Sequence, residues 1–151
     1  MVKKVLVPLD GSKYADKALD CALDLAETYS AEILLLSVIH VSPIAYIAPH
    51  LGIPTGASIS VRNYGEEIEG YLKRVLSEAV EKAKKAKPYL KVTTKLVKGR
   101  PAYEIVEIAK EEKVDIIVMG HRGLSGIKKL FLGSVSNQVI NEAPCPVLIT
   151  K

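Results

Sequence analysis

The sequence predicts an α/β fold in which helices wrap a parallel β-sheet. Short β-branched apolar segments alternate along the chain with longer segments whose apolar residues recur every three or four positions. Hydrophobic residues make up 48% and charged residues 25% of the 151 residues, which is ordinary for a globular chain. That length is typical of one domain, so we expect residues 1–151 to form a single one.

The first part of the chain predicts a strand, a helix and a second strand. Lys4–Pro8 is typical of a buried strand that Pro8 ends, and Ile33–Ile39 of a strand covered on both faces. Between them the apolar spacing predicts a helix, with Ser12 as its N-cap. The apolar positions of this helix are Ala15, Ala18, Leu19, Ala22, Leu23, Leu25 and Ala26.

Residues 42–62 interrupt this alternation. They mix apolar side chains such as Ile44 and Leu51 with prolines and glycines, which predicts a long, variable apolar loop. Long loops in compact domains often serve as lids or binding loops. The alternative is a loop or short helix that packs over the core or contacts another subunit, and the sequence leaves both interpretations open.

The second part of the chain predicts three helices and three strands in alternation. Pro101 suits the first turn of a helix because its missing N–H would be unpaired there in any case. The predicted elements are a helix at Glu66–Lys87, a strand at Leu90–Val97, a helix at Ala102–Lys113, a strand at Asp115–Met119, a helix at Ser134–Asn141 and a strand at Pro146–Thr150.

Charge and composition narrow the function classes. Lys and Arg number 21 against 17 Asp and Glu, and the resulting net charge of +4 favours small anions without implying a nucleic-acid partner. The aromatic residues are scattered, whereas binding of single-stranded nucleic acid would need a stacking platform. No apolar run approaches the roughly 18 residues of a membrane span, so we expect no membrane partner and a cytoplasmic location. Cys21 and Cys145 are too far apart in sequence to indicate a zinc site.

A glycine-punctuated segment follows the predicted strand at 115–119 and ends where a helix begins. Glycines let a backbone approach a phosphate closely, and successive amides form a nest for anionic oxygens. A helix N-terminus adds unpaired amides and a favourable dipole. Neither a Walker P-loop nor a dinucleotide fingerprint is present. The segment therefore predicts an anion site, near which Arg122, Lys128 and Lys129 add positive charge.

The pattern G-x2-G-x9-G-S, which spans Gly120, Gly123, Gly133 and Ser134, resembles the nucleotide-binding pattern of the universal stress protein family. Four further segments resemble strands of that family in the same order. They are 5–12, 34–38, 114–120 and 144–149. The resemblance covers the whole chain except residues 42–62.

The resemblance implies a Rossmann-like, open, five-stranded parallel sheet of order 3-2-1-4-5 with helices on both faces. It also implies a homodimer paired through the last strand, 147–150, and the branch of the family that binds ATP, with Mg²⁺ as its companion ion. The residues implied to hold the ribose and phosphates are Gly120, Gly123, Gly133, Ser134 and Val135. Those implied to line the adenine and ribose end are Pro8, Asp10 and Val38, with Met119 closing the base pocket.

Several of these residues also have simpler interpretations. Asp10 either contacts the nucleotide or its Mg²⁺ through water, or is a turn residue whose carboxylate caps the next helix. Ser134 is equally suited to be an N-cap, and Gly120 and Gly123 to shape a turn. His121 stands where the family often has Ser or Thr, which leaves open whether its side chain touches phosphate.

Three functions remain open at this point. The first is an ATP-binding switch or regulator in the stress response that acts on an unknown protein partner. The second is a slow ATPase, for which no catalytic residue is assigned and only His121 and Asp10 are candidates to position water. The third is a nucleotide-free dimeric interaction module in which the glycines only shape a loop.

Overall fold

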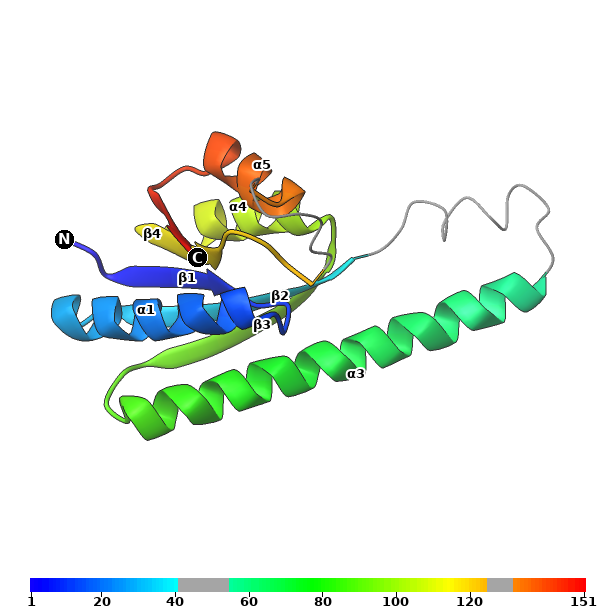
Figure 1. Ribbon diagram of the computed structural model, residues 1–151, viewed down its shortest axis with the longest axis horizontal. Helices are drawn as coiled ribbons and strands as arrows, with labels where there is room; N and C mark the ends of the chain where they lie inside the picture. The colour runs from blue at the N-terminus through cyan, green and yellow to red at the C-terminus, as the bar shows by residue number, and fades with distance from the viewer. Residues whose placement is uncertain (41–54, 125–131) are drawn as a thin grey trace.

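The computed structural model describes residues 1–40, 55–124 and 132–151, and only the backbone of residues 55–64. Its centre is a five-stranded sheet of order β3-β2-β1-β4-β5 (Figure 1), with every neighbouring pair parallel. The predicted class, the Rossmann-like fold and the strand order 3-2-1-4-5 are thus confirmed. The strands are β1 (Lys4–Pro8), β2 (Glu32–His40), β3 (Val92–Gly99), β4 (Ile116–Gly120) and β5 (Val147–Thr150).

Helices cover both faces of the sheet. Figure 1 shows α1 (Lys13–Tyr29) and α3 (Thr55–Ala86) on one side, and α4 (Pro101–Glu111) and α5 (Ser134–Glu142) on the other. Because side chains alternate along a strand, Val5 and Val7 of β1 pack in the α1/α3 layer while Leu6 packs in the α4/α5 layer. Within the described ranges, no helix combines the length and apolarity that a bilayer crossing requires.

Local signals explain where the helices start and stop. The Ser12 hydroxyl accepts a hydrogen bond from the Ala15 amide at 3.1 Å and caps α1 as predicted. Ser30 then ends the helix in the left-handed conformation, with φ 54°. Pro101 occupies the first turn of α4, also as predicted. The N-cap of α5, however, is Gly133 and not Ser134, which is the first residue of the helix itself.

One element differs clearly from its prediction. The helix expected at 66–87 begins at Thr55, so part of the loop expected at 42–62 is helical. After Pro54 no proline breaks the helix, and extending an existing helix costs far less than starting a new one. The rest of that loop, residues 41–54, lies outside the described residues.

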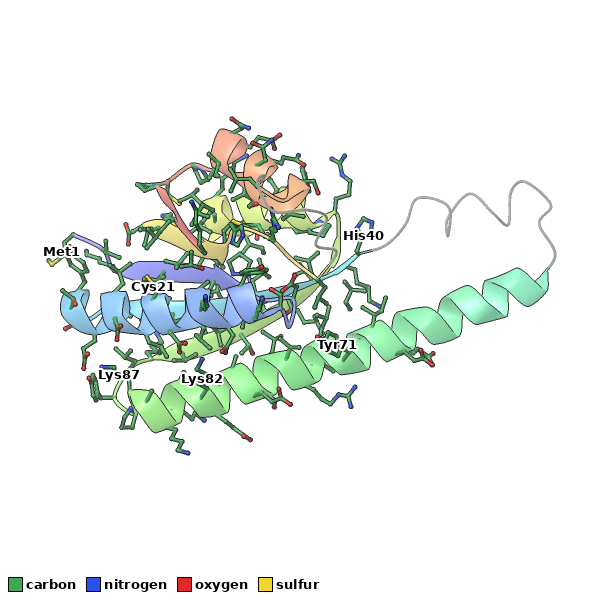
Figure 2. The ribbon with its side chains drawn as sticks, viewed as in Figure 1. Met1, Cys21, His40, Tyr71, Lys82 and Lys87 are labelled. Carbon is green, nitrogen blue, oxygen red and sulfur yellow. The ribbon has the colours of Figure 1, made fainter. Side chains whose placement is uncertain are left out.

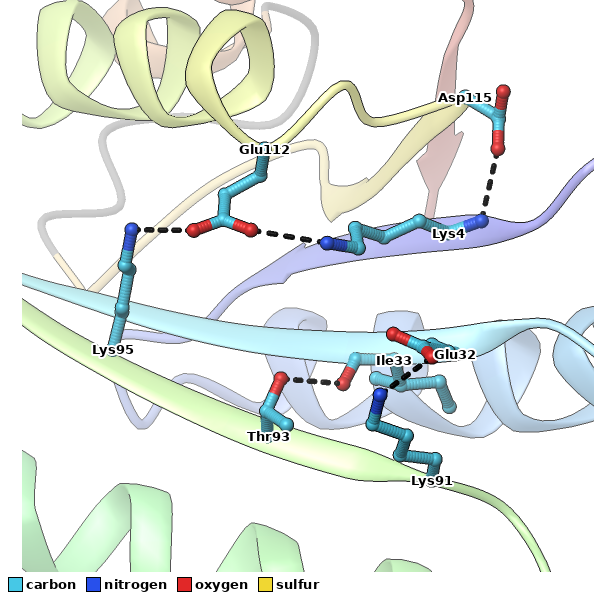
Figure 3. Close-up of polar contacts among 8 residues, drawn as sticks. All are labelled: Lys4, Glu32, Ile33, Lys91, Thr93, Lys95, Glu112 and Asp115. Carbon is cyan, nitrogen blue, oxygen red and sulfur yellow. Dashed lines mark hydrogen bonds and ion pairs between the residues drawn. The ribbon is translucent and has the colours of Figure 1, made fainter.

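Ion pairs and hydrogen bonds of charged side chains connect the start of β1 to neighbouring elements (Figure 3). The Glu112 carboxylate, at the end of α4, binds the Lys4 ammonium at 3.0 Å and the Lys95 ammonium of β3 at 2.6 Å. Hydrogen bonds from Lys95 and Lys4 lower the pKa of Glu112 below its ordinary value. Asp115 accepts the backbone amides of Lys3 and Lys4 at 2.7 and 2.9 Å, and these bonds lower its pKa as well.

Candidate functional site

All five strands are parallel, so their carboxyl ends meet at one edge of the sheet. From β1 the chain proceeds to β2 and β3 on one side and later to β4 and β5 on the other, which makes the boundary between β1 and β4 a topological switch point. Ligands of open α/β sheets bind at such a point. Two segments meet there, the turn at 10–12 after β1 and the loop at 120–124 after β4.

Asp10 joins these two segments. One of its carboxylate oxygens, Oδ1, accepts the Ser12 amide of its own turn at 2.9 Å. The other, Oδ2, accepts the Leu124 amide of the glycine loop at 3.1 Å. The carboxylate therefore supports the turn and holds the loop against it, while the cap of α1 comes from Ser12. The interpretation of Asp10 as the helix cap is thus wrong.

Two loop glycines are needed for close packing. A Cβ at Gly123 would collide with Oδ2 of Asp10, so a side chain here would displace the carboxylate that holds the loop. A Cβ at Gly120 would lie 2.7 Å from the Tyr14 Cβ and 2.8 Å from the Tyr14 carbonyl carbon, so a side chain here would push α1 from the end of β4. Neither glycine has positive φ, so the reason for each is space and not backbone conformation.

Among the glycines that the structure describes, Gly11 adopts a positive φ, at 85°. A Cβ there would collide with the Tyr71 hydroxyl of α3, so this turn is also pressed against a helix on its other side. Between α1 and α3 the structure has an open groove of about 800 Å³, lined by residues that include Gly11, Tyr71 and Lys82. Figure 2 shows Tyr71 and Lys82 on α3 facing α1. This groove lies on the α3 side of the turn and does not include the glycine loop.

The N-terminus of α5 is held close to the end of β4. The Gly133 amide donates to the His121 carbonyl at 2.8 Å, and no side chain caps the helix. The hydroxyl of Ser136 is buried and lies within hydrogen-bond distance of two carbonyl oxygens, that of His121 at 2.9 Å and that of Gly133 at 3.0 Å. Ser134 is exposed and Val135 is half-buried, so the first turn of α5 faces solvent at the predicted position. First-turn amides of a helix have no partner within it and favour anionic ligands.

The side chain of His121 contacts the protein itself. Its Nδ1 lies 3.1 Å from the Thr150 carbonyl, which also accepts the His121 backbone amide at 2.9 Å. Its ring meets the Tyr14 ring edge-on, with 4.3 Å between the ring centroids and 74° between the ring planes. Thr150 completes the cluster, because its hydroxyl donates to the Tyr14 carbonyl at 3.3 Å.

The residues predicted for the base end lie near one another but differ in surroundings. Met119 is buried, and half-buried Val38 packs against the same apolar cluster on the α4/α5 face. Pro8 is half-buried at the end of β1 and pairs with Leu36, two residues before Val38 on the adjacent strand. All three therefore lie near the same sheet edge as Asp10. Lys128 and Lys129 lie outside the described residues.

The side chains of the site offer few ligands for Mg²⁺. Among residues 1–40, 55–124 and 132–151, no three His, Cys, Asp or Glu side chains gather to hold a metal ion. Asp10 is the carboxylate at the switch point, and both of its oxygens already accept a backbone amide. Mg²⁺ usually binds one or two carboxylates together with substrate phosphates and water. The donor set thus fits only an ion that arrives with a phosphate group.

Sequence reasoning did not identify four residues that shape the site. They are Tyr14, Leu124, Ser136 and Thr150. Leu124 and Thr150 act through backbone atoms, which leave no signal in residue type. Tyr14 and Ser136 are ordinary helix residues by spacing, and their contacts join segments far apart in the chain.

The model of the universal stress protein family matches residues 1–151. Universal stress protein YxiE of Bacillus subtilis is 39% identical over 155 residues, which cover 100% of both chains. The solved structure of protein MJ0577 of Methanocaldococcus jannaschii has 34% identity and a TM-score of 0.75, covering 100% of this chain and 96% of that one.

A further solved structure is a universal stress protein in complex with cAMP. It is 28% identical, has a TM-score of 0.66, and covers 99% of this chain and 96% of that one. The match of the family model to the full chain and the whole-length similarity to YxiE agree with the sheet order and the position of the glycine loop. This chain belongs to the universal stress protein family.

Proposed function

We propose that this chain is a cytoplasmic regulator that binds an adenine nucleotide, primarily ATP. The proposed site is the switch point at the carboxyl ends of β1 and β4. The observation that carries the proposal is the Asp10–Leu124 contact, which holds the glycine loop at the switch point. The first turn of α5 lies beside that loop, and its amides at Ser134 and Val135 have no partner within the part of the chain that the structure describes. The relative solved with cAMP supports an adenine nucleotide as ligand class.

The proposed contacts follow the two ends of the ligand. The ribose and phosphates bind the loop glycines and the first turn of α5, where amides and the helix dipole favour negative charge. The adenine end lies over the ends of β1 and β2, with Met119 beneath it. The proposed phosphate and ribose residues are Gly120, Gly123, Gly133, Ser134 and Val135, and those at the adenine end are Pro8, Asp10, Val38 and Met119. The phosphates, with Asp10 through water, would hold Mg²⁺, which would supply neutralisation of the phosphate charge.

Regulation is favoured over hydrolysis by what the two candidate groups already do. Phosphoryl transfer to water needs a residue that orients the attacking water. Asp10 and His121 each have a structural contact, Asp10 with the Ser12 and Leu124 amides and His121 through Nδ1–H with the Thr150 carbonyl, and each keeps a lone pair able to accept a proton from water. We assign no catalytic residue and expect any ATPase activity to be weak.

The proposal includes a homodimer paired through β5, so that nucleotide binding acts on a dimer and its protein partner. β5 is an edge strand of the sheet and pairs only with β4 in the described residues. Leu148 of this strand is 38% exposed. An edge strand that presents an apolar side chain is suited to pair with a second copy.

The test is thermal unfolding of nucleotide-stripped protein with Mg-ATP, ADP, AMP, cAMP and GTP. A ligand that binds only the folded state raises the free energy of unfolding by about 2.7 kcal/mol at one hundred times its Kd. We expect a saturable rise in Tm with adenine nucleotides and little with GTP. No shift at millimolar nucleotide would reject the proposal in favour of a nucleotide-free interaction module. Phosphate release over many turnovers, lost in Asp10→Ala or His121→Ala, would favour the ATPase instead.

A further inference from the structure

We infer that His121 is a positioning residue, whose imidazole fixes the first turn of α5 and thereby sets nucleotide affinity without touching the nucleotide. The inference rests on the proposed function, since it concerns the same site. Whether the His121 side chain touches phosphate was left open by the sequence, and the inference assigns it a contact within the protein instead. Three observations support it: the hydrogen bonds of His121 to Thr150, the hydrogen bonds that its carbonyl accepts, and the contact of its ring with Tyr14.

The first observation is the anchoring of His121 to the end of β5. The Thr150 carbonyl accepts two hydrogen bonds from this one residue, from its backbone amide at 2.9 Å and its Nδ1 at 3.1 Å. A carbonyl oxygen can only accept, so Nδ1 carries the proton in this contact. Two bonds to one carbonyl fix both the backbone and the side chain of residue 121.

The second observation concerns the opposite side of the residue. The His121 carbonyl accepts the Gly133 amide at 2.8 Å and the Ser136 hydroxyl at 2.9 Å. Gly133 provides no side-chain cap, and the Ser136 side chain is buried at 2% exposure. The start of α5 is therefore located by this carbonyl, in the place where a side-chain cap commonly acts.

The third observation fixes the orientation of the ring. The imidazole meets the Tyr14 ring edge-on at 4.3 Å, and the ammonium of Lys13 lies 5.1 Å from the centroid of that tyrosine ring. Gly120 gives Tyr14 the space to approach the end of β4.

Together these contacts form a continuous connection from β5 through His121 to α5. In the first turn of α5, the amides that the proposed function assigns to the ribose and phosphates are those of Ser134 and Val135, and they directly follow the Gly133 amide that the His121 carbonyl holds. Displacing those amides weakens a phosphate contact because hydrogen bonds depend steeply on distance and angle. Loss of the imidazole should therefore loosen the start of α5 and reduce affinity together.

The experiment compares His121→Ala and His121→Asn with wild-type protein. Two quantities are measured: the Kd for Mg-ATP by calorimetry, and the hydrogen-exchange rate of the Gly133 amide by NMR without nucleotide. We expect His121→Ala to raise the Kd about tenfold, the size expected for one lost hydrogen bond and one aromatic contact. Gly133 exchange should accelerate severalfold. His121→Asn should restore most of both, because its amide N–H can donate to the Thr150 carbonyl.

Two further variants serve as controls, one for lost stability and one for the hydrogen bonds to the His121 carbonyl. Ile33→Val, near the start of β2 in the buried core of the α1/α3 layer, lowers stability away from this connection and should leave both quantities unchanged. Ser136→Ala removes one of the two bonds to the His121 carbonyl and should accelerate Gly133 exchange even if His121→Ala does not fold.

Several results would overturn the inference. An unchanged Kd in His121→Ala would do so directly. A raised Kd with wild-type Gly133 exchange would show that the ring contacts the nucleotide instead. If wild-type protein binds no nucleotide, the proposed function fails and the affinity part fails with it. Faster Gly133 exchange in His121→Ala would still establish that His121 holds the start of α5.

Discussion

Oδ2 of Asp10 accepts the backbone amide of Leu124 at 3.1 Å, although 114 positions separate the two residues in the chain. This contact joins the turn after β1 to the glycine loop after β4, the two segments that border the switch point of the sheet. It also explains why residue 123 lacks a side chain, since a Cβ there would collide with the same carboxylate oxygen.

Gly123→Val is expected to abolish nucleotide-dependent stabilisation. The added side chain displaces the Asp10 carboxylate, releases the loop from the β1 turn and blocks close approach of a phosphate. The measurement is the Tm with and without saturating Mg-ATP. Gly70→Ala is the matched control, because nothing lies within 4 Å of a Cβ at Gly70. It should keep the full ATP shift and gain roughly 1 kcal/mol of stability from higher helix propensity. A normal ATP shift in Gly123→Val would reject the site.

Gly120→Ala is expected to destabilise the fold even without nucleotide. Its Cβ would lie 2.8 Å from the Tyr14 carbonyl carbon and 3.0 Å from the carbonyl oxygen, and these backbone atoms cannot rotate away. Overpacking of this kind costs about 1–3 kcal/mol. Urea unfolding followed by circular dichroism measures the change, and a midpoint equal to wild type would show that α1 shifts without cost.

Acid should weaken the protein partly through Asp115. Backbone hydrogen bonds from Lys3 and Lys4 lower the pKa of this carboxyl in the folded state. A lowered folded pKa adds stability above the unfolded pKa, near 3.9, and this stability is lost as the pH falls through the folded value. Wild type should therefore exceed Asp115→Asn in stability at pH 7, with the difference shrinking below about pH 4.

The control for this prediction is Asp24→Asn. Its side chain is 82% exposed, and its carboxylate lies 4.0 Å from the Lys87 ammonium, at the limit for an ion pair. Exposed pairs of this kind contribute little to the free energy of unfolding. Chemical unfolding at a series of pH values measures both variants. A difference between wild type and Asp115→Asn that stays constant from pH 7 to pH 3 would contradict the role given to the Asp115 charge.

Leu148→Lys is expected to weaken the proposed homodimer. The substitution places a charge on the exposed side of edge strand β5, where burial against a second copy would leave it without a partner. Sedimentation velocity across a concentration series should show a larger fraction of monomer than in wild type. Ile140→Lys, on the exposed side of α5, gives a charge-matched comparison away from the strand edge. Equal dissociation in both variants would argue against pairing through β5.

The fold was predictable because its signals are local. The alternation of apolar segments indicates strands and helices, and Ser12 and Pro101 mark two helix starts that the structure confirms. The start of α3 was not predictable in the same way. Residues 55–62 have the composition of a loop, and their helix continues one that tertiary packing stabilises farther along the chain.

Part of the candidate site was predictable from the sequence and part was not. Glycine spacing and the β4–α5 connection indicate an anion-binding loop, and the resemblance names its residues. The N-cap of α5 was misplaced by one residue because Gly133 is held through its backbone amide, which donates to the His121 carbonyl, and no pattern of residue types reveals such a bond. The packing contacts of Gly120 and Gly123 were not predicted. Their role in packing depends on Tyr14 and Asp10, which are distant in the chain.

The sequence by itself determined the α/β class, most helix and strand positions and the location of the glycine loop, because hydrophobic periodicity and turn chemistry act over a few residues. Only the tertiary structure decided that Asp10 holds Leu124 and that His121 joins Thr150 to Gly133. These contacts depend on backbone atoms brought together by the parallel sheet. Every residue carries the same amide and carbonyl groups, so their pairing follows from the fold and not from the identity of the residues.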